Sequence, residues 1–277
     1  MIKLTPDKEL KVQKKTIKFG KHTIPFLVIS PKDQIQNKSP VILWIHGGGY
    51  ILGLKEMVYS SRAIELVKKY GVTVVSPGYR LALFSPYPCA IDDCYQVLLW
   101  INEHLKELNS DFSKIMVGGE SAGGGLCAAL CIKARNQGKV KIAFQMPLYP
   151  MLDNFDTPTS KNNHGKVWNT KKNHFGWKMY LRKAAKNQVS PEASPSRETD
   201  YSFLPPCYTF VGDGEPFYFE TLEYVENLKK AGIEAKVDVY HTNIHAFDML
   251  KPKLDISKLA AQNFNQNFEY ALKNYLG

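Results

Sequence analysis

A serine held between glycines at a predicted strand-to-helix junction is the feature that most constrains this chain. The segment Gly119-Glu120-Ser121-Ala122-Gly123 follows an apolar run at 114–118 and opens a small-residue helix expected over 122–134. A turn this sharp leaves no space for bulky side chains two residues before or after the serine, and glycine at both places removes the collision. The pattern predicts that Ser121 projects from the edge of a sheet as a candidate nucleophile. Alone, the motif could also be an ordinary glycine-rich turn, so the neighbouring motifs decide.

The composition is that of an ordinary globular protein with one large core. The chain has 277 residues, 44% hydrophobic and 22% charged, which suits a single α/β domain over residues 1–277. It has no apolar run of about 18 residues and no apolar leader at its start, so we expect neither a membrane anchor nor secretion. Five cysteines, an odd number without a C-x-x-C pair, favour buried free thiols in a reducing compartment, and hence a cytoplasmic location.

The net charge of +10 is distributed unevenly along the chain. Residues 161–186 contain seven lysines and one arginine but no Asp or Glu. Such a stretch could steer anionic substrates or touch an acidic surface, but a solvated lysine-rich face is the safest interpretation. The chain has no recognisable nucleic-acid-binding module and no compact platform of aromatic and basic residues, so we expect no nucleic-acid partner.

Strand and helix patterns alternate through most of the sequence, which predicts a mainly parallel sheet covered by helices on both faces. The first two strands resemble an antiparallel pair that turns at Gly20. We expect strands at 16–19, 24–30, 41–45, 72–76, 114–117, 142–146, 207–211 and 235–240, and helices at 55–69, 90–108, 122–134, 217–231 and 256–275.

One long segment, about 152–206, interrupts this alternation and is called the insertion below. It is polar, basic and rich in Asn, Ser and Pro, with an aromatic helical piece near 174–183. Because a structureless loop of this length is uncommon inside a domain, we expect a partly helical cap over the carboxyl ends of the strands. Its aromatic residues could line a substrate pocket or form the insertion's own small core; they are Trp168, Phe175, Trp177 and Tyr180.

A run of glycines follows the strand expected at 41–45. In His46-Gly47-Gly48-Gly49-Tyr50, the absence of side chains lets backbone amides approach a ligand closely. Taken alone this segment could be a flexible loop or an anion-binding nest. Beside an elbow serine, such a loop typically supplies the amides that stabilise the oxyanion of acyl transfer. We expect His46 to hold the loop rather than to act as a base.

A serine nucleophile needs a base and a carboxylate that orients the base. His245 follows the last expected strand and so lies at the same sheet edge as the serine; His241 is the nearest competitor, but it abuts the strand. For the acid, the turn after the strand at 207–211 offers Asp213 and Glu215. We favour Glu215, which precedes a proline at the expected helix start, whereas Asp213 could instead cap the turn. The predicted triad is thus Ser121, Glu215 and His245, in that chain order.

Together these motifs resemble the hormone-sensitive-lipase-like branch of the α/β-hydrolase family. The resemblance implies an α/β-hydrolase fold with an eight-stranded, mainly parallel sheet and a small cap, and carboxylesterase or lipase-like activity without a metal or an organic cofactor. It also implies an oxyanion hole formed by the amides of Gly48, Gly49 and Ala122. The likeness rests on His46-Gly47-Gly48-Gly49, Gly119-Glu120-Ser121-Ala122-Gly123-Gly124, His245-Ala246-Phe247, and Tyr79-Arg80-Leu81-Ala82 with Pro86, Pro88 and Asp93.

The chain departs from the family pattern at two places that bear on function. The family's usual acid before the proline is Asp, and here it is Glu215; a Pro-Glu pair expected after Ala82 is replaced by Leu83-Phe84. Neither change removes a catalytic group. By the resemblance we expect a small-molecule ester with a short or medium acyl chain as substrate, and possible homodimerisation through the last strand. The same triad could instead serve an amidase, an arylformamidase or a deacetylase, or the chain could be a hydrolase-derived receptor that binds a ligand without turnover.

Overall fold

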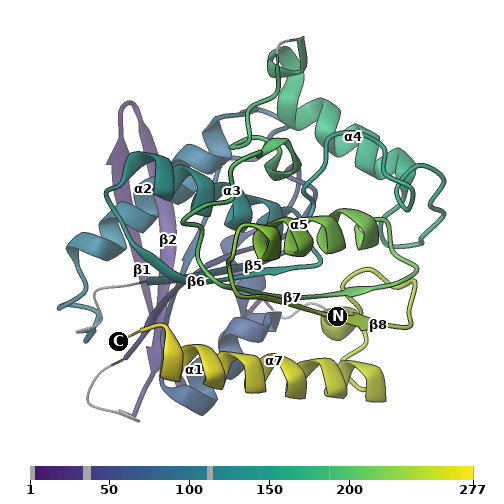
Figure 1. The fold of residues 1–277 in the computed structure, drawn as a ribbon. Coiled ribbons are helices and arrows are strands. Elements are labelled where there is room, and N and C mark those ends of the chain that lie inside the picture. Colours follow the sequence, from purple (N-terminus) through teal and green to yellow (C-terminus); the bar gives the residue numbers. More distant parts are fainter. Residues whose placement is uncertain (1–3, 34–38, 111–114, 187, 277) are drawn as a thin grey trace.

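The computed structural model of the chain describes residues 4–33, 39–110, 115–186 and 188–276. One eight-stranded sheet runs through it in the order β1-β2-β4-β3-β5-β6-β7-β8, which confirms the predicted fold class (Figure 1). Strand β2 pairs antiparallel with both β1 and β4, and the remaining neighbours pair in parallel. The strands are β1 Leu10–Phe19, β2 His22–Pro31, β3 Val41–Ile45, β4 Thr73–Pro77, β5 Ile115–Glu120, β6 Ile142–Leu148, β7 Cys207–Gly212 and β8 Ala235–Tyr240.

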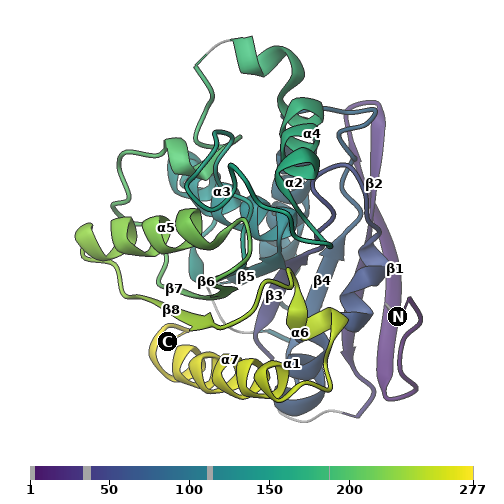
Figure 2. The ribbon, with the colours of Figure 1, turned by 90° about the vertical axis from the view of Figure 1, so that its right-hand side faces the viewer.

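Helices cover both faces of the sheet. Helices α1 and α7 pack on one face, and α2, α3 and α5 pack on the other (Figure 2). The central strands β3, β4 and β5 are buried along their whole length, as expected for parallel strands with a helix layer on each side. The α-helices are α1 Arg62–Tyr70, α2 Cys89–Glu103, α3 Ala122–Gln137, α4 Thr170–Leu181, α5 Tyr218–Lys230, α6 Phe247–Leu250 and α7 Asp255–Asn274, and the 3-10 helices are Lys55–Ser60, Arg182–Lys186 and Pro195–Arg197.

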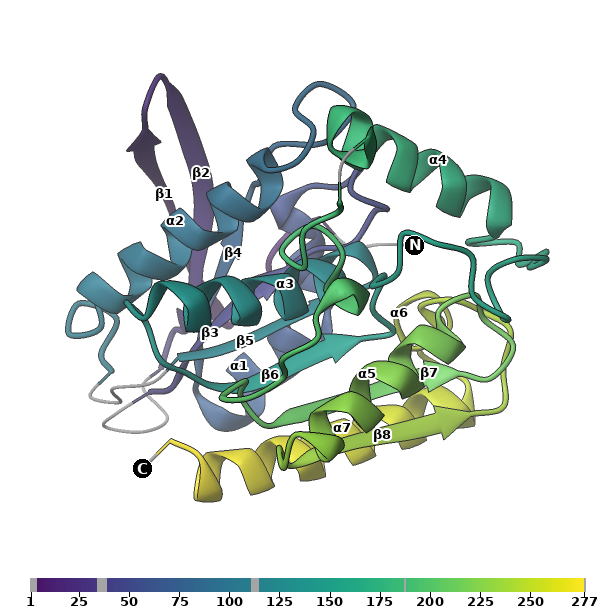
Figure 3. The same ribbon diagram turned by 45° about the horizontal axis from the view of Figure 1, so that its top comes forward.

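The insertion contains α4 and the last two of the 3-10 helices. Helix α4 lies on the side of the sheet opposite α1 and α7 (Figure 3). Its residues Trp177 and Tyr180 pack against Tyr50, with the Tyr180 and Tyr50 rings stacked at 4.1 Å between centroids. The helical piece thus begins four residues earlier than the sequence predicted, because Asn169 caps it by accepting a hydrogen bond from the Lys172 amide.

Most cysteine side chains are buried, as the sequence predicted, but Cys89 at the start of α2 is only partly buried. None of the helices in the described part of the chain is both long and apolar enough to cross a bilayer.

Candidate active site

The turn around Ser121 is as cramped as the sequence indicates. Ser121 joins β5 to α3 with φ 57° and ψ −119°, a conformation that costs energy for any residue with a side chain. A Cβ on Gly119 would lie 2.5 Å from the Ile45 carbonyl oxygen, and one on Gly123 only 2.1 Å from the same atom. Glycine is therefore required at both places, and the turn presents the serine hydroxyl at the carboxyl end of the central strand.

The structure brings the three predicted triad residues together from distant parts of the chain. His245 Nε2 lies 2.8 Å from Ser121 Oγ, and His245 Nδ1 lies 2.5 Å from Glu215 Oε2. All three side chains are buried, Glu215 completely. The Gly212 amide at the end of β7 donates to Glu215 Oε1 at 2.7 Å, which leaves Oε2 to face the imidazole. This arrangement fixes the Nδ1–H tautomer of His245, because the carboxylate accepts from that nitrogen.

The two alternative residues weighed from the sequence pair with each other instead. His241 Nδ1 lies 2.8 Å from Asp213 Oδ2, and Asp213 Oδ1 accepts a hydrogen bond from the Thr242 amide at 3.1 Å. The His241 side chain is fully exposed, and the neighbouring Asp213 carboxylate raises the pKa of its imidazole. This pair ties the β7 turn to the β8 turn and takes no part in the contacts of Ser121.

The glycine loop faces the serine with unpaired amides. Gly48 and Gly49 have φ values of 120° and 60°, and a Cβ on Gly48 would lie 2.1 Å from the Leu52 carbonyl oxygen. Within the described residues, the amides of Gly48, Gly49 and Ala122 donate to no protein acceptor. Gly48, Gly49 and Ser121 line the same cavity. Amides left unpaired beside a nucleophile are suited to receiving a developing oxyanion.

His46 supports the glycine loop from beneath. Its ring stacks on Tyr79 at 4.3 Å, its Nδ1 lies 2.8 Å from the Gly47 carbonyl oxygen, and the Tyr79 hydroxyl donates to the His46 carbonyl oxygen at 3.0 Å. Burial lowers the pKa of His46 to about 4, so the ring is neutral at physiological pH. A neutral ring with its Nδ1 bonded to the loop has the structural role expected from the sequence.

The motif that follows β4 is held by a charge pair. Arg80 Nε and Nη2 lie 2.9 Å and 2.7 Å from the two carboxylate oxygens of Asp93, which is fully buried on α2. The Leu83-Phe84 replacement leaves this pair in place, and Phe84 points into solvent with 88% of its surface exposed.

A small apolar cavity of about 160 Å³ opens above the serine. The insertion contributes Val167 and Trp168 to the wall of this cavity. The aromatic residues of the insertion therefore divide between the two interpretations, pocket lining and small core. Trp168 lines the cavity, Trp177 and Tyr180 are core residues on the buried face of α4, and Phe175 is exposed on the same helix. The remaining lining residues are Gly47, Gly48, Gly49, Met57, Glu120, Ser121, Tyr149, His245, Ala246, Met249 and Leu250.

The sequence analysis gave no role to three ionisable residues that are buried near the triad: Arg62, Glu120 and Asp248. Asp248, three residues after His245, forms an ion pair with Arg62 of α1 at 3.0 Å between Oδ2 and Nε. Glu120 accepts a hydrogen bond from Trp44 Nε1 at 2.9 Å, and burial raises the pKa of Glu120 to about 8. The sequence places Glu120 next to Ser121 and Asp248 three residues after His245, but it does not indicate that Asp248 pairs with Arg62.

No group of three His, Cys, Asp or Glu side chains converges as a metal site in the described parts of the chain. The described polar groups around Ser121 are instead those of acyl transfer: a hydroxyl, an imidazole, a carboxylate and free amides.

Comparison with known proteins places this geometry in a family. A family profile described as alpha/beta hydrolase fold matches residues 42–249. Esterase LipI of Mycobacterium tuberculosis (strain ATCC 25618 / H37Rv) is 29% identical over 214 residues, 76% of this chain and 67% of the relative. An arylesterase of Saccharolobus solfataricus is 31% identical over 234 residues, 83% of this chain and 75% of the relative.

Solved structures agree with these relatives. A bacterial heroin esterase superposes with a TM-score of 0.87 at 31% identity, covering 92% of this chain and 82% of the other. The profile match includes the glycine loop, the elbow serine and the late histidine. The chain therefore belongs to the α/β-hydrolase family, in the hormone-sensitive-lipase-like esterase branch.

Proposed function

We propose that this chain, a carboxylic ester hydrolase of the α/β-hydrolase fold, cleaves short- to medium-chain acyl esters through a covalent acyl-enzyme on Ser121. One observation carries the proposal: the Ser121–His245–Glu215 hydrogen-bond chain lies beside three amides without an acceptor among the described residues. The relatives named as esterases support the choice of an ester over other acyl compounds.

In the first half of the reaction, Ser121 Oγ attacks the ester carbonyl carbon while its proton passes to His245 Nε2. The electrons of the carbonyl double bond move to the oxygen, and the amides of Gly48, Gly49 and Ala122 donate to that oxyanion. The Glu215 carboxylate stabilises the imidazolium without taking its proton. When the carbonyl re-forms, the bond to the alkoxy oxygen breaks and His245 Nε2 gives its proton to the departing alcohol.

In the second half, water takes the place of the alcohol. His245 Nε2 removes a proton from this water as its oxygen attacks the acyl carbon, and the same amides hold the second oxyanion. Collapse breaks the bond to Ser121 Oγ, which regains a proton from the imidazolium. The carboxylic acid leaves and the free serine is restored.

Replacing Ser121 by Ala tests the proposal. We expect Ser121→Ala to lower kcat for p-nitrophenyl butyrate by on the order of 10⁶-fold, because alanine has no hydroxyl that can attack the ester and carry the acyl group. A fluorophosphonate probe should add one covalent adduct to the wild type, on Ser121, and none to the variant. Ser202→Ala, a serine in the turn beside Asp200, is the matched control and should keep full labelling and activity.

Two results would contradict the proposal. Hydrolysis by Ser121→Ala near the wild-type rate would assign the reaction to another group. A wild-type protein that takes up no probe and turns over no ester would instead be a ligand receptor.

For the location of the protein we propose the cytoplasm. All five cysteines are free and four of them are buried, as in proteins that stay in a reducing compartment.

A further inference from the structure

Trp168 lies directly on the glycine loop. A Cβ added to Gly49 would lie 2.1 Å from Trp168 Cη2, so the indole occupies the space above this loop residue. The carbonyl oxygen of Gly49 lies close to α4 as well, 3.0 Å from where a Cβ on Gly176 would stand. The insertion thus reaches the candidate oxyanion hole through one aromatic ring.

The indole is oriented by a buried amide. Trp168 Nε1 donates to Asn173 Oδ1 at 3.3 Å, and Asn173 on α4 is almost completely buried. This hydrogen bond fixes which edge of the ring faces the cavity. Asn173 is therefore a positioning residue for Trp168.

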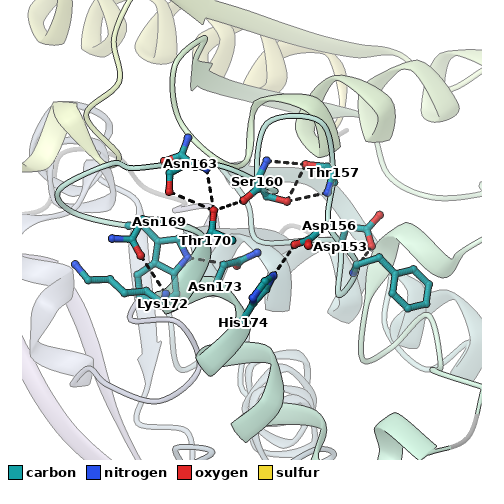
Figure 4. A network of polar contacts seen from close by, with 12 residues as sticks. Asp153, Asp156, Thr157, Ser160, Asn163, Asn169, Thr170, Lys172, Asn173 and His174 are labelled. Atoms are coloured by element: carbon teal, nitrogen blue, oxygen red, sulfur yellow. Dashed lines mark hydrogen bonds and ion pairs between the residues drawn. The ribbon is translucent and has the colours of Figure 1, made fainter.

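The segment 159–170, which carries Trp168, is held in place by its own polar contacts (Figure 4). Thr170 Oγ1 donates to the Ser160 carbonyl oxygen at 2.6 Å, and it accepts from the Asn163 amide at 2.8 Å. Thr159 Oγ1 donates at 2.9 Å to the carbonyl oxygen of Pro216, next to the triad acid. Because both ends of the segment are tied down, Trp168 is a fixed wall rather than part of a loose lid.

We propose that Trp168 sets the upper size limit of the acyl group that the enzyme accepts. The proposal rests on the proposed function. An ester whose carbonyl oxygen faces the free amides must place its leaving oxygen near His245 Nε2, because that nitrogen supplies the proton. The alkoxy group then lies toward the histidine turn, where Ala246, Met249 and Leu250 line the cavity. The acyl group is left on the glycine-loop side, which Trp168 covers.

The cavity volume agrees with a limit at short chains. At about 160 Å³ the cavity is well below the roughly 300–1,000 Å³ of common ligand pockets. An acyl chain that lengthens on the glycine-loop side meets the indole, and a fixed wall that excludes a methylene changes kcat/KM by about 10- to 200-fold. The wild type should therefore favour short acyl groups such as acetyl over octanoyl or decanoyl.

The experiment uses the full chain and two series of esters. In the first series, p-nitrophenyl esters carry acyl groups of increasing length from acetyl to decanoyl; in the second, acetate esters carry alkyl alcohols of increasing length. We expect Trp168→Ala to raise kcat/KM for octanoyl relative to acetyl by about tenfold or more, and to leave the ratios in the alcohol series within about twofold. Asn173→Ala should shift the acyl ratio in the same direction by a smaller factor, since the indole stays but loses its anchor.

Phe175→Ala is the matched control, because Phe175 is an exposed aromatic residue of α4 that does not line the cavity. It should leave both series unchanged. Trp168→Leu provides a second, more conservative variant, and its acyl ratio should lie between those of wild type and Trp168→Ala.

Three results would overturn the proposal: unchanged acyl ratios in the Trp168 variants, a gain in the alcohol series instead, or an equal shift in Phe175→Ala. Failure of the proposed function is distinguishable, because Ser121→Ala would then still hydrolyse esters, or the wild type would hydrolyse no ester of either series and take up no probe.

Discussion

Glutamate at position 215 is one methylene longer than the aspartate of the family pattern, and the turn before it accommodates the difference. Glu215 Oε1 accepts from the Gly212 amide, and a Cβ on Gly212 would lie 2.5 Å from the Thr242 carbonyl oxygen and 3.3 Å from Glu215 Oε1. The absence of a side chain at Gly212 thus leaves space for the Glu215 carboxylate to bond to the Gly212 amide. The following proline favoured Glu215 over Asp213 in the sequence, but no sequence pattern indicated that the Asp213 carboxylate pairs with His241.

Substitutions at these two carboxylates should separate their roles. We expect Glu215→Gln to lower kcat by about 10³- to 10⁴-fold, because an amide no longer enforces the correct tautomer or stabilises the imidazolium. Asp213→Asn should change kcat by less than about threefold, since the Asp213 carboxylate bonds to His241 and the Thr242 amide rather than to His245. Steady-state kinetics on one short ester checks both. A larger loss for Asp213→Asn than for Glu215→Gln would reverse the assignment.

At the scale of elements, the helix expected at 55–69 is divided. Residues Lys55–Ser60 form a 3-10 helix, Ser61 is extended, and α1 begins at Arg62. Ser61 Oγ accepts from the Ala63 amide at 3.2 Å and donates to the Val58 carbonyl oxygen at 2.8 Å. The apolar periodicity continues across this break, so the pattern alone merged the two pieces. Helix α6 was missed because four residues are too few to show a period.

Because of this break, α1 begins at Arg62, which links the helix to the segment after His245. Arg62 is almost completely buried, and its ion pair with the fully buried Asp248 joins α1 to α6, the short helix that follows His245. Arg62 Nη2 also donates to the Asp248 carbonyl oxygen at 3.1 Å. We expect Arg62→Met to lower the free energy of unfolding by about 3 kcal/mol, because it leaves the buried Asp248 carboxylate without its cationic partner.

Urea denaturation followed by fluorescence measures this loss. The control is Arg62→Met combined with Asp248→Asn, which removes both charges and should recover at least half of the lost stability. If the double variant is less stable than Arg62→Met alone, the carboxylate without its partner is not the cause.

At the scale of the whole molecule, the mainly parallel sheet follows from alternating strand and helix patterns, because each pattern is a local property. The same rule places Ser121 and His245 at one sheet edge, since parallel strands share their carboxyl ends. Contacts such as Trp168 on Gly49 or Arg62 with Asp248 could not be foreseen. They join segments far apart in the chain, and nothing in either segment specifies the other.

Global stability should depend on pH through His46. Its pKa is about 4 in the fold against 6.5 normally, so below pH 6.5 the unfolded chain binds a proton that the folded chain does not. The contribution of His46 to the free energy of unfolding is complete above pH 6.5 and falls as the pH decreases. Near pH 4 the loss amounts to about 3 kcal/mol. We expect urea denaturation at pH 7.5, 6 and 5 to show this loss as a change in the difference in free energy of unfolding between the wild type and His46→Phe.

His46→Phe is the control for this pH dependence, because phenylalanine keeps a ring to stack on Tyr79 but has no titrating nitrogen. Only the difference between the two proteins reports on His46, since Glu120, with its pKa raised to about 8, contributes a pH dependence of opposite sign. Parallel stability curves for the two proteins would rule out His46 as the source.

The hydrogen bond between His245 and Ser121 spans 124 positions of the chain. During synthesis the imidazole partner of Ser121 emerges only after β7 and β8 have been made, because His245 follows β8 in the chain. A nascent chain that ends before His245 therefore has no imidazole to activate Ser121. Topology alone delays reactivity until the last strand has joined the sheet, so the return of esterase activity on refolding would mark completion of the sheet's final edge.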